Sequence, residues 1–130
     1  MSIFKSILNT VPRPWLIKVS YLVRPIIALS LKGNKYTDPI DGKSFRKFLP
    51  YGYSKNVARA NALCPGSLSL ERHRLLWLYL KNKTNFFTAK HKLLHIAPEQ
   101  CFYKLFKAMP NLDYVTGDYN SPIADHHFDL

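Results

Sequence analysis

Acidic residues, cysteine and long apolar runs are all scarce in this sequence. Eight Asp and Glu stand against nineteen Lys and Arg, which gives a formal net charge of +11 over 130 residues. Such an excess favours a polyanionic neighbour: nucleic acid, an anionic membrane surface or a phosphorylated substrate. Two cysteines, Cys64 and Cys101, are too few for a disulfide framework and fit a reducing compartment.

The first 32 residues lack an uninterrupted apolar run. Lys18, Arg24 and Pro25 break the stretch, so it falls short of the roughly 20 apolar residues of a membrane-spanning helix. No cleavage site follows an apolar segment, which excludes a typical secretory signal. The pattern instead predicts two short amphipathic helices, divided at Pro12 and Pro14. Their apolar faces comprise Ile3, Phe4, Ile7, Leu8 and Val11 in the first helix, and Trp15, Val19, Leu22, Val23 and Ile26 in the second.

Two roles for these helices stay open. Their apolar faces can pack on the rest of the protein, or they can lie in the interface of an anionic leaflet. The second role would use the basic residues Lys5, Arg13, Lys18, Arg24 and Lys32. We expect a cytoplasmic protein, with peripheral contact at the inner membrane as the open alternative.

Residues 33–67 are rich in turns and contain two knuckles at the place and spacing of the Cys-x-x-Cys pairs of a zinc ribbon. The first is "DPIDG" (38–42) and the second is "CPGS" (64–67). Because Asp38, Asp41 and Ser67 stand where a closed zinc site has thiolate or imidazole ligands, no metal is expected. We predict a metal-free, ribbon-like hairpin region with a strand near 44–49. Its packing residues would be Phe45, Phe48 and Tyr51.

A helical pattern begins after residue 67 and ends near Lys81. Ser67 or Ser69 can cap this helix, and it is expected to be well buried. Its predicted inward residues are Leu68, Leu75, Leu76 and Tyr79. The "ERHR" cluster at 71–74 has two interpretations: a solvated face, or cations directed at a carboxylate or phosphate.

Strand, helix and strand then follow in about thirty residues. The sequence predicts a strand over 92–97 that is covered on both sides, a helix over 100–108 and a second strand over 112–116. Phe102, Leu105 and Phe106 are expected to point inward from the helix. Such a unit is parallel and right-handed by default. Two parallel strands alone would make a poor sheet.

The turn at Ala97-Pro98-Glu99 contains no glycine, and Asp118 follows the second strand nineteen residues after Glu99. Ligands of parallel sheets bind at the carboxyl ends of the strands. A carboxylate there can accept hydrogen bonds from both hydroxyls of a ribose. The alternative is that Asp118 only forms a turn. His126 and His127 would point to opposite faces of a strand, so a shared metal is not expected.

Five segments carry a resemblance to a known family. They are "DGKSFRKFLPYG", "LSLERHRLLWLYLK", "LLHIAPEQCFYKLFK", "LDYVTGDYNSPIAD" and the terminal "FDL". Together they resemble the bacterial class I S-adenosylmethionine-dependent methyltransferases of the methyltransferase type 11 kind, in the form of a Bacteroidetes-like subgroup. The resemblance spans nearly the whole chain and implies a Rossmann-like fold. In that fold the first strand and turn hold the methionine part of the cofactor.

The resemblance also implies roles for individual residues. His95 stands where the strand's usual acid would be, and Ala97, Glu99 and Cys101 stand where three glycines would be. Asp118 corresponds to the ribose-binding acid and Asp129 to the acid beside the adenine. The implied cofactor-binding residues are His95, Ala97, Pro98, Glu99, Asp118 and Asp129.

Physical chemistry allows these substitutions. Ala97 and Pro98 are small enough to let a cofactor approach. Glu99 can take the cofactor's ammonium group, or it can merely cap or charge the N-terminus of the following helix. We expect His95 to act first as a partly buried hydrogen-bonding residue and second as a cofactor contact.

The sequence therefore predicts three stretches: amphipathic helices at 1–32, a degenerate ribbon at 33–67, and the incomplete start of a Rossmann-like methyltransferase domain at 68–130. As an amino-terminal fragment it would bind S-adenosylmethionine weakly or not at all, and its methyl acceptor is not identified. The alternative is a non-enzymatic basic module that binds an anionic membrane surface or nucleic acid. Nucleic acid is the less favoured partner.

Overall fold

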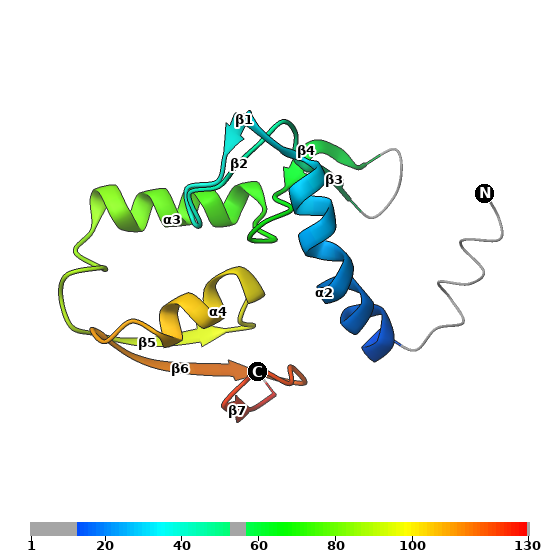
Figure 1. Cartoon of the computed structure of the whole chain (residues 1–130). Coiled ribbons are helices and arrows are strands. Elements are labelled where there is room, and N and C mark those ends of the chain that lie inside the picture. Colours follow the sequence, from blue (N-terminus) through cyan, green and yellow to red (C-terminus); the bar gives the residue numbers. More distant parts are fainter. Residues whose placement is uncertain (1–12, 53–56, 130) are drawn as a thin grey trace. The chain divides into compact units, whose positions relative to one another are not determined.

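The computed structural model describes residues 13–52 and 57–129, and these form a mixed α/β protein with three helices and small sheets. The chain divides into two compact units, Met1–Gly66 and Ser67–Leu130 (Figure 1). This division lies next to the predicted boundary at 67/68. The first predicted amino-terminal helix lies outside the described residues. Within the described part, no helix is long and apolar enough to cross a membrane.

The first unit, Met1–Gly66, combines one helix with two antiparallel strand pairs. Its helix is α2 (Arg13–Ser30); its strand pairs are β1 (Lys32–Thr37) with β2 (Ser44–Phe45), and β3 (Leu49–Tyr51) with β4 (Arg59–Leu63). The core comprises Leu31, Phe45, Phe48 and Cys64, with Ile27, Ala28, Tyr36 and Leu49 packed against it. The strand expected near 44–49 is therefore two strands, β2 and β3, that belong to different sheets.

Of the three predicted packing residues of this region, Phe45 and Phe48 are buried, whereas Tyr51 is exposed. The prediction for Tyr51 is wrong because the pairing of β3 with β4 shifts register between Leu49 and Tyr51. Leu49 packs against the core, and the irregularity turns Tyr51 away from it.

The two predicted knuckles lie together. The Ile40 amide donates to Asp38 Oδ1 (3.0 Å), and Gly42 closes the turn at a φ of +70°. A Cβ built on Gly66 would lie 2.8 Å from Asp41 Oδ2, so the second knuckle packs directly on the first. Over residues 13–52 and 57–129, no three metal-ligating side chains form a group that could hold an ion. Hydrogen bonds stabilise the first knuckle internally, and close packing at Gly66 joins the second knuckle to it.

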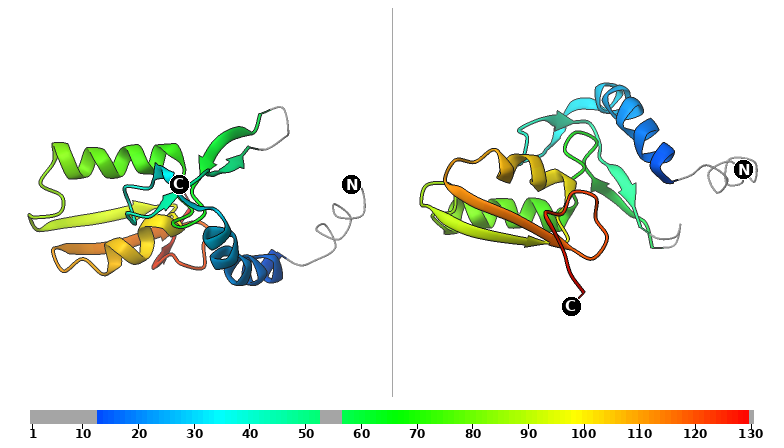
Figure 2. Two further views of the ribbon diagram at one scale, coloured as in Figure 1. Left: turned by 45° about the horizontal axis from the view of Figure 1, so that its top comes forward. Right: turned by 90° about the horizontal axis from the view of Figure 1, so that it is seen from below.

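The second unit, Ser67–Leu130, contains the predicted parallel strand-helix-strand (Figures 1 and 2). Its elements are α3 (Glu71–Lys83), β5 (His91–Ile96), α4 (Gln100–Lys107), β6 (Leu112–Asp118) and β7 (His126–His127). β5 and β6 pair in parallel from His91↔Leu112 to Ile96↔Gly117. The sheet has a third strand that was not predicted to pair: β7 adds to β6, also in parallel.

Aromatic stacking forms the core of this unit. Phe102 and Phe106 stack on one another, with ring centroids 5.0 Å apart, and Trp77 of α3 lies parallel to both, at 6.3 and 6.4 Å. Leu105, expected to be inward, is exposed. It lies beside the Phe102–Phe106 stripe, and a helix of only eight residues buries little more than that stripe.

The predicted inward face of α3 is wrong. Leu75, Leu76 and Tyr79 are exposed, whereas His73 is buried and Trp77 packs on the α4 rings. The apolar residues of α3 form one unbroken run over 75–80, which extends around the helix and singles out no side. The aromatic partners on α4 therefore determine which face is inward.

The predicted helix cap is also wrong. The N-cap residue of α3 is Leu70, not Ser67 or Ser69. The Leu70 amide donates to Nδ1 of His73 (3.0 Å), so a side chain of the first turn bonds back to the N-cap amide. The Ser69 hydroxyl instead accepts a hydrogen bond from Arg74 (3.3 Å).

β5 is covered on one face only, which corrects the prediction of cover on both sides. Burial alternates along the strand, and Leu94 and Ile96 are 57% and 50% exposed. The rings of Phe86 and Phe106 lie against His91 and His95, which occupy the other face. On the face that carries Leu94 and Ile96, the ring of Phe128 lies over Gly117, the partner of Ile96, but it leaves both β5 side chains exposed.

Candidate functional site

The bend between β5 and α4 has the backbone of a glycine turn without a glycine. Ala97 has a φ of +51°, in the left-handed region that an L-residue enters at a cost of about 1–2 kcal/mol. Its amide donates to the carbonyl of Gly117 on β6 (2.9 Å). Pro98 behind it is buried, and Glu99 is the N-cap residue of α4. This conformation leaves Ala97 exposed at the edge of the sheet.

The carboxyl ends of three strands meet at that edge. Gly117 pairs with Ile96 on one side and with His126 on the other, and Asp118 pairs with His127. Because side chains alternate along a strand, Asp118 belongs to the same face of β6 as Tyr114, whose hydroxyl bonds His95. Asp118 is thus on the face of β6 that carries Tyr114, at the end of the sheet where the Ala97 bend lies.

Asp118 forms a turn, as the alternative interpretation predicted. Its Oδ1 accepts hydrogen bonds from the amides of Asn120 and Ser121, both at 2.8 Å. These bonds do not involve Oδ2, which is the atom that a ribose could meet. Asp129 is exposed and follows Phe128, whose amide donates to the Asp118 carbonyl (3.3 Å). Both acids therefore lie at the same end of the sheet.

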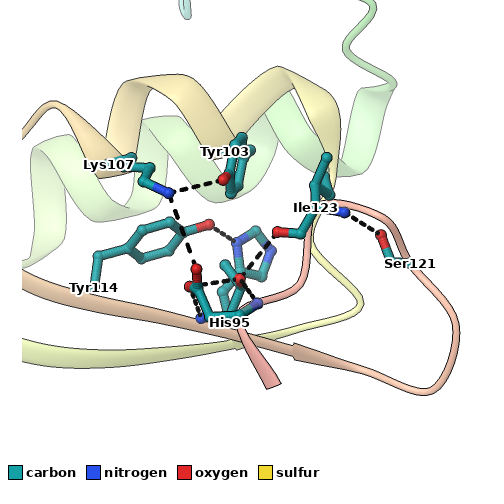
Figure 3. Close-up of polar contacts among 8 residues, drawn as sticks. His95, Tyr103, Lys107, Tyr114, Ser121 and Ile123 are labelled. Carbon is teal, nitrogen blue, oxygen red and sulfur yellow. Dashed lines mark hydrogen bonds and ion pairs between the residues drawn. The ribbon is translucent and has the colours of Figure 1, made fainter. Parts of the chain in front are cut away.

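His95 is the partly buried hydrogen-bonding residue that the sequence predicted. Its Nδ1 lies 2.8 Å from the Tyr114 hydroxyl (Figure 3), and its Nε2 lies 2.6 Å from Glu99 Oε2. An ionised carboxylate only accepts hydrogen bonds, so Nε2 carries a proton and donates to Glu99. Burial, followed by the nearby Tyr103, raises the pKa of Tyr114 to about 12, so its phenol stays protonated at neutral pH.

A second imidazole approaches Glu99 from α3. Buried His73 places Nε2 3.4 Å from Glu99 Oε1, while its Nδ1 accepts from the Leu70 amide. The glutamate is thus held between His73 and His95. Glu99 is the N-cap residue of α4, as one interpretation predicted, but its side chain makes no capping hydrogen bond. The carboxylate therefore adds charge at the helix N-terminus without bonding the helix amides. The "ERHR" cluster directs one of its members, His73, at a carboxylate.

A further pair closes the loop before β7. Asp125 Oδ2 accepts hydrogen bonds from the amide (3.0 Å) and the hydroxyl (2.8 Å) of Thr116. These bonds lower the pKa of Asp125. Figure 3 shows Lys107 directed toward Tyr103, and its Nζ donates to the Tyr103 hydroxyl at 2.9 Å. The hydrogen bonds between Asp125 and Thr116 hold the loop that leads from Asp118 to β7.

Sequence reasoning missed Tyr114, Thr116 and Asp125, and it did not join His73 to Glu99. For the strand residues a signal was available. In a parallel pair, residues in register share a face, so placing Leu93 opposite Tyr114 brings Tyr114 toward the neighbouring His95. For His73 there was no local signal, because its partner lies on another helix.

Comparisons with known proteins add no information about this site. No protein-family model matches the chain, and no match was found among curated proteins or solved structures. One cavity lies in the first unit, and another is lined by residues such as Lys90 and Asn111 at the amino ends of β5 and β6. Neither lies at the Ala97 bend.

The burial of His73 predicts a pH-dependent stability of the second unit. Burial is the main cause that lowers the pKa of His73 below 6.5; Arg72 and Arg74 lower it further, and Glu99 opposes them. The unfolded chain then binds more protons than the folded one, so stability falls as the pH drops from about 6.5 toward the folded pKa. Urea unfolding between pH 7 and 5 should show this slope. It should shrink in His73→Asn and persist in His126→Asn, since His126 is exposed.

Proposed function

We propose that the Ser67–Leu130 unit is the cofactor-binding start of a class I S-adenosylmethionine-dependent methyltransferase with a Rossmann-like sheet. One observation carries the proposal: the left-handed Ala97 bend bonds the carbonyl of Gly117, the residue before Asp118. A turn for the amino-acid part of the cofactor and an acid for its ribose therefore belong to adjacent parallel strands. This is the arrangement in which sheets of this class bind nucleotides.

Each residue then has a separate role. Asp118 would accept the ribose hydroxyls through Oδ2, and Asp129 would lie beside the adenine. The Ala97-Pro98 bend would admit the methionine part. Glu99, which is partly exposed and oriented by His95, would meet the ammonium group. The bound cofactor supplies the methyl group on a sulfonium; the protein needs to align it with the acceptor and exclude water.

We expect this chain to bind the cofactor weakly. The candidate contacts come from one edge of a three-stranded sheet, and Leu94 and Ile96 on its other face remain exposed. Residues that would select a methyl acceptor are not identified among these contacts.

The test is a titration of the isotopically labelled chain with S-adenosylhomocysteine, followed by NMR. We expect the amide signals of Ala97, Gln100 and Asp118 to shift together. Asp118→Asn should abolish the shifts: the amide oxygen still accepts from Asn120 and Ser121, but the second acceptor becomes a donor that cannot receive a ribose hydroxyl.

Asp113→Asn is the matched control. Asp113 is an exposed acid on the same strand, farther from its carboxyl end, so its variant should respond as the wild type does. If the wild type shows no shifts at Ala97 and Asp118, or if Asp118→Asn responds like Asp113→Asn, the proposal is wrong.

A further inference from the structure

The positive charge of this protein is concentrated in its first unit. Met1–Gly66 contains eleven Lys and Arg against two acids, Asp38 and Asp41, whereas Ser67–Leu130 contains eight against six. The methyltransferase proposal concerns only the second unit. It does not explain the excess of basic residues in the first unit.

Helix α2 presents apolar side chains to solvent. Leu22, Ile26 and Leu29 are 73%, 68% and 73% exposed, and their spacing places them on one side of the helix. Ile27 and Ala28, on the other side, pack against the core of the unit. The helix thus has apolar residues on two sides: one set packs on the core of the unit, and the other is exposed to solvent.

A cavity of about 600 Å³ adjoins the exposed stripe, between α2 and the residues of β2. Its apolar lining includes Pro25, Leu29 and Phe45, and three cations line it as well: Arg24, Lys32 and Lys43. Leu29 belongs both to the cavity and to the exposed stripe, so the two features form one continuous surface. Lys43 lies 3.8 Å from Asp41, which offsets part of this positive charge.

We propose that this surface docks the protein on a membrane that contains anionic phospholipid. Leu22, Ile26 and Leu29 enter the interface, and the cavity holds a phosphate headgroup among Arg24, Lys32 and Lys43. An interfacial helix combines apolar insertion with attraction between basic residues and anionic lipid. None of the described helices can span the bilayer, so the contact is peripheral.

Nucleic acid explains the same observations less well. A phosphate backbone would pair with the cations but would leave the three apolar side chains of α2 in water. Phospholipid is the phosphate-bearing partner that also accommodates an apolar stripe. The inference is independent of the methyltransferase proposal, because it uses no residue after Gly66.

Sedimentation of the full chain with lipid vesicles tests the proposal. We expect binding to vesicles of phosphatidylcholine and phosphatidylglycerol in equal parts, and little binding to phosphatidylcholine alone. Ile26→Gln/Leu29→Gln should weaken binding at least tenfold, since each lost apolar side chain removes several inserted methylene groups. Arg24→Gln and Lys32→Gln should each weaken it about fivefold, the factor for one basic residue near an anionic surface.

Two matched controls come from the second unit. Leu75→Gln changes a leucine of α3 that is 70% exposed, and Lys81→Gln changes an exposed lysine of the same helix; both should bind as the wild type does. The proposal is overturned if phosphatidylcholine alone binds equally well, or if the controls lose as much binding as the α2 variants. It is also overturned if inorganic phosphate or a DNA oligonucleotide binds as tightly as the vesicles and is insensitive to Ile26→Gln/Leu29→Gln.

Discussion

Replacing Phe102 with alanine is expected to unfold the Ser67–Leu130 unit. The ring is 1% exposed, stacks on Phe106 and Trp77, and meets the edge of His73 at 5.6 Å. Removing a buried phenylalanine side chain costs about 3–5 kcal/mol. A domain of this size rarely has more than about 3–5 kcal/mol of stability, so the change should remove nearly all of it.

Near-UV circular dichroism and urea unfolding would measure the effect, because Trp77 reports on the stack directly. Leu75→Ala is the control: it removes an exposed side chain from the same helix and should change stability by less than about 0.5 kcal/mol. A Phe102→Ala variant that unfolds cooperatively within about 1 kcal/mol of the wild type would show that the aromatic stack is not the core of this unit.

Gly33→Ala is expected to destabilise the other unit most. A Cβ at this position would lie 2.7 Å from the backbone nitrogen of Arg46 and 2.9 Å from its Cα. That nitrogen donates to the Leu31 carbonyl at 2.8 Å, so the obstacle is hydrogen-bonded backbone that cannot turn aside. Overpacking of this kind costs about 1–3 kcal/mol, to which the weakened hydrogen bond adds about 1 kcal/mol.

Gly42→Ala separates steric conflict from backbone conformation. Gly42 has a φ of +70°, but nothing lies within 4 Å of a Cβ built there. Its replacement should cost only the left-handed penalty of about 1 kcal/mol. Urea unfolding followed through the ring signals of Phe45 and Phe48 would compare the two variants. Equal costs would mean that the close approach of Gly33 to Arg46 has no energetic consequence.

The two proposals can fail separately. Asp118→Asn should leave vesicle binding unchanged, because it alters only the carboxyl edge of β6. Ile26→Gln/Leu29→Gln should leave the nucleoside-induced NMR shifts unchanged, because the residues proposed to bind the cofactor all belong to the other unit. If only the NMR titration or only the vesicle sedimentation gives the expected result, the corresponding proposal stands and the other is wrong.

Local chemistry was sufficient for much of the second unit. The order β5, α4, β6 and the parallel pairing followed from an apolar run, a proline bend and a helical period. Of the three residues predicted to point inward from the short helix, Phe102 and Phe106 are buried and Leu105 is exposed. The knuckles at Asp38 and Cys64 were likewise located from turn residues, and the structure brings them together.

Partners distant in the sequence decided the rest. The inward face of α3 depends on the rings of α4, since its apolar residues form one continuous run over 75–80 and no period singles out one side. Glu99 lies between His73 and His95 because α3 begins, and β5 ends, near the start of α4. The cover on only one face of β5, and the addition of β7, depend on which segments pack on the sheet. A sequence records which side chains prefer burial, but which surface buries them is determined only when the chain folds.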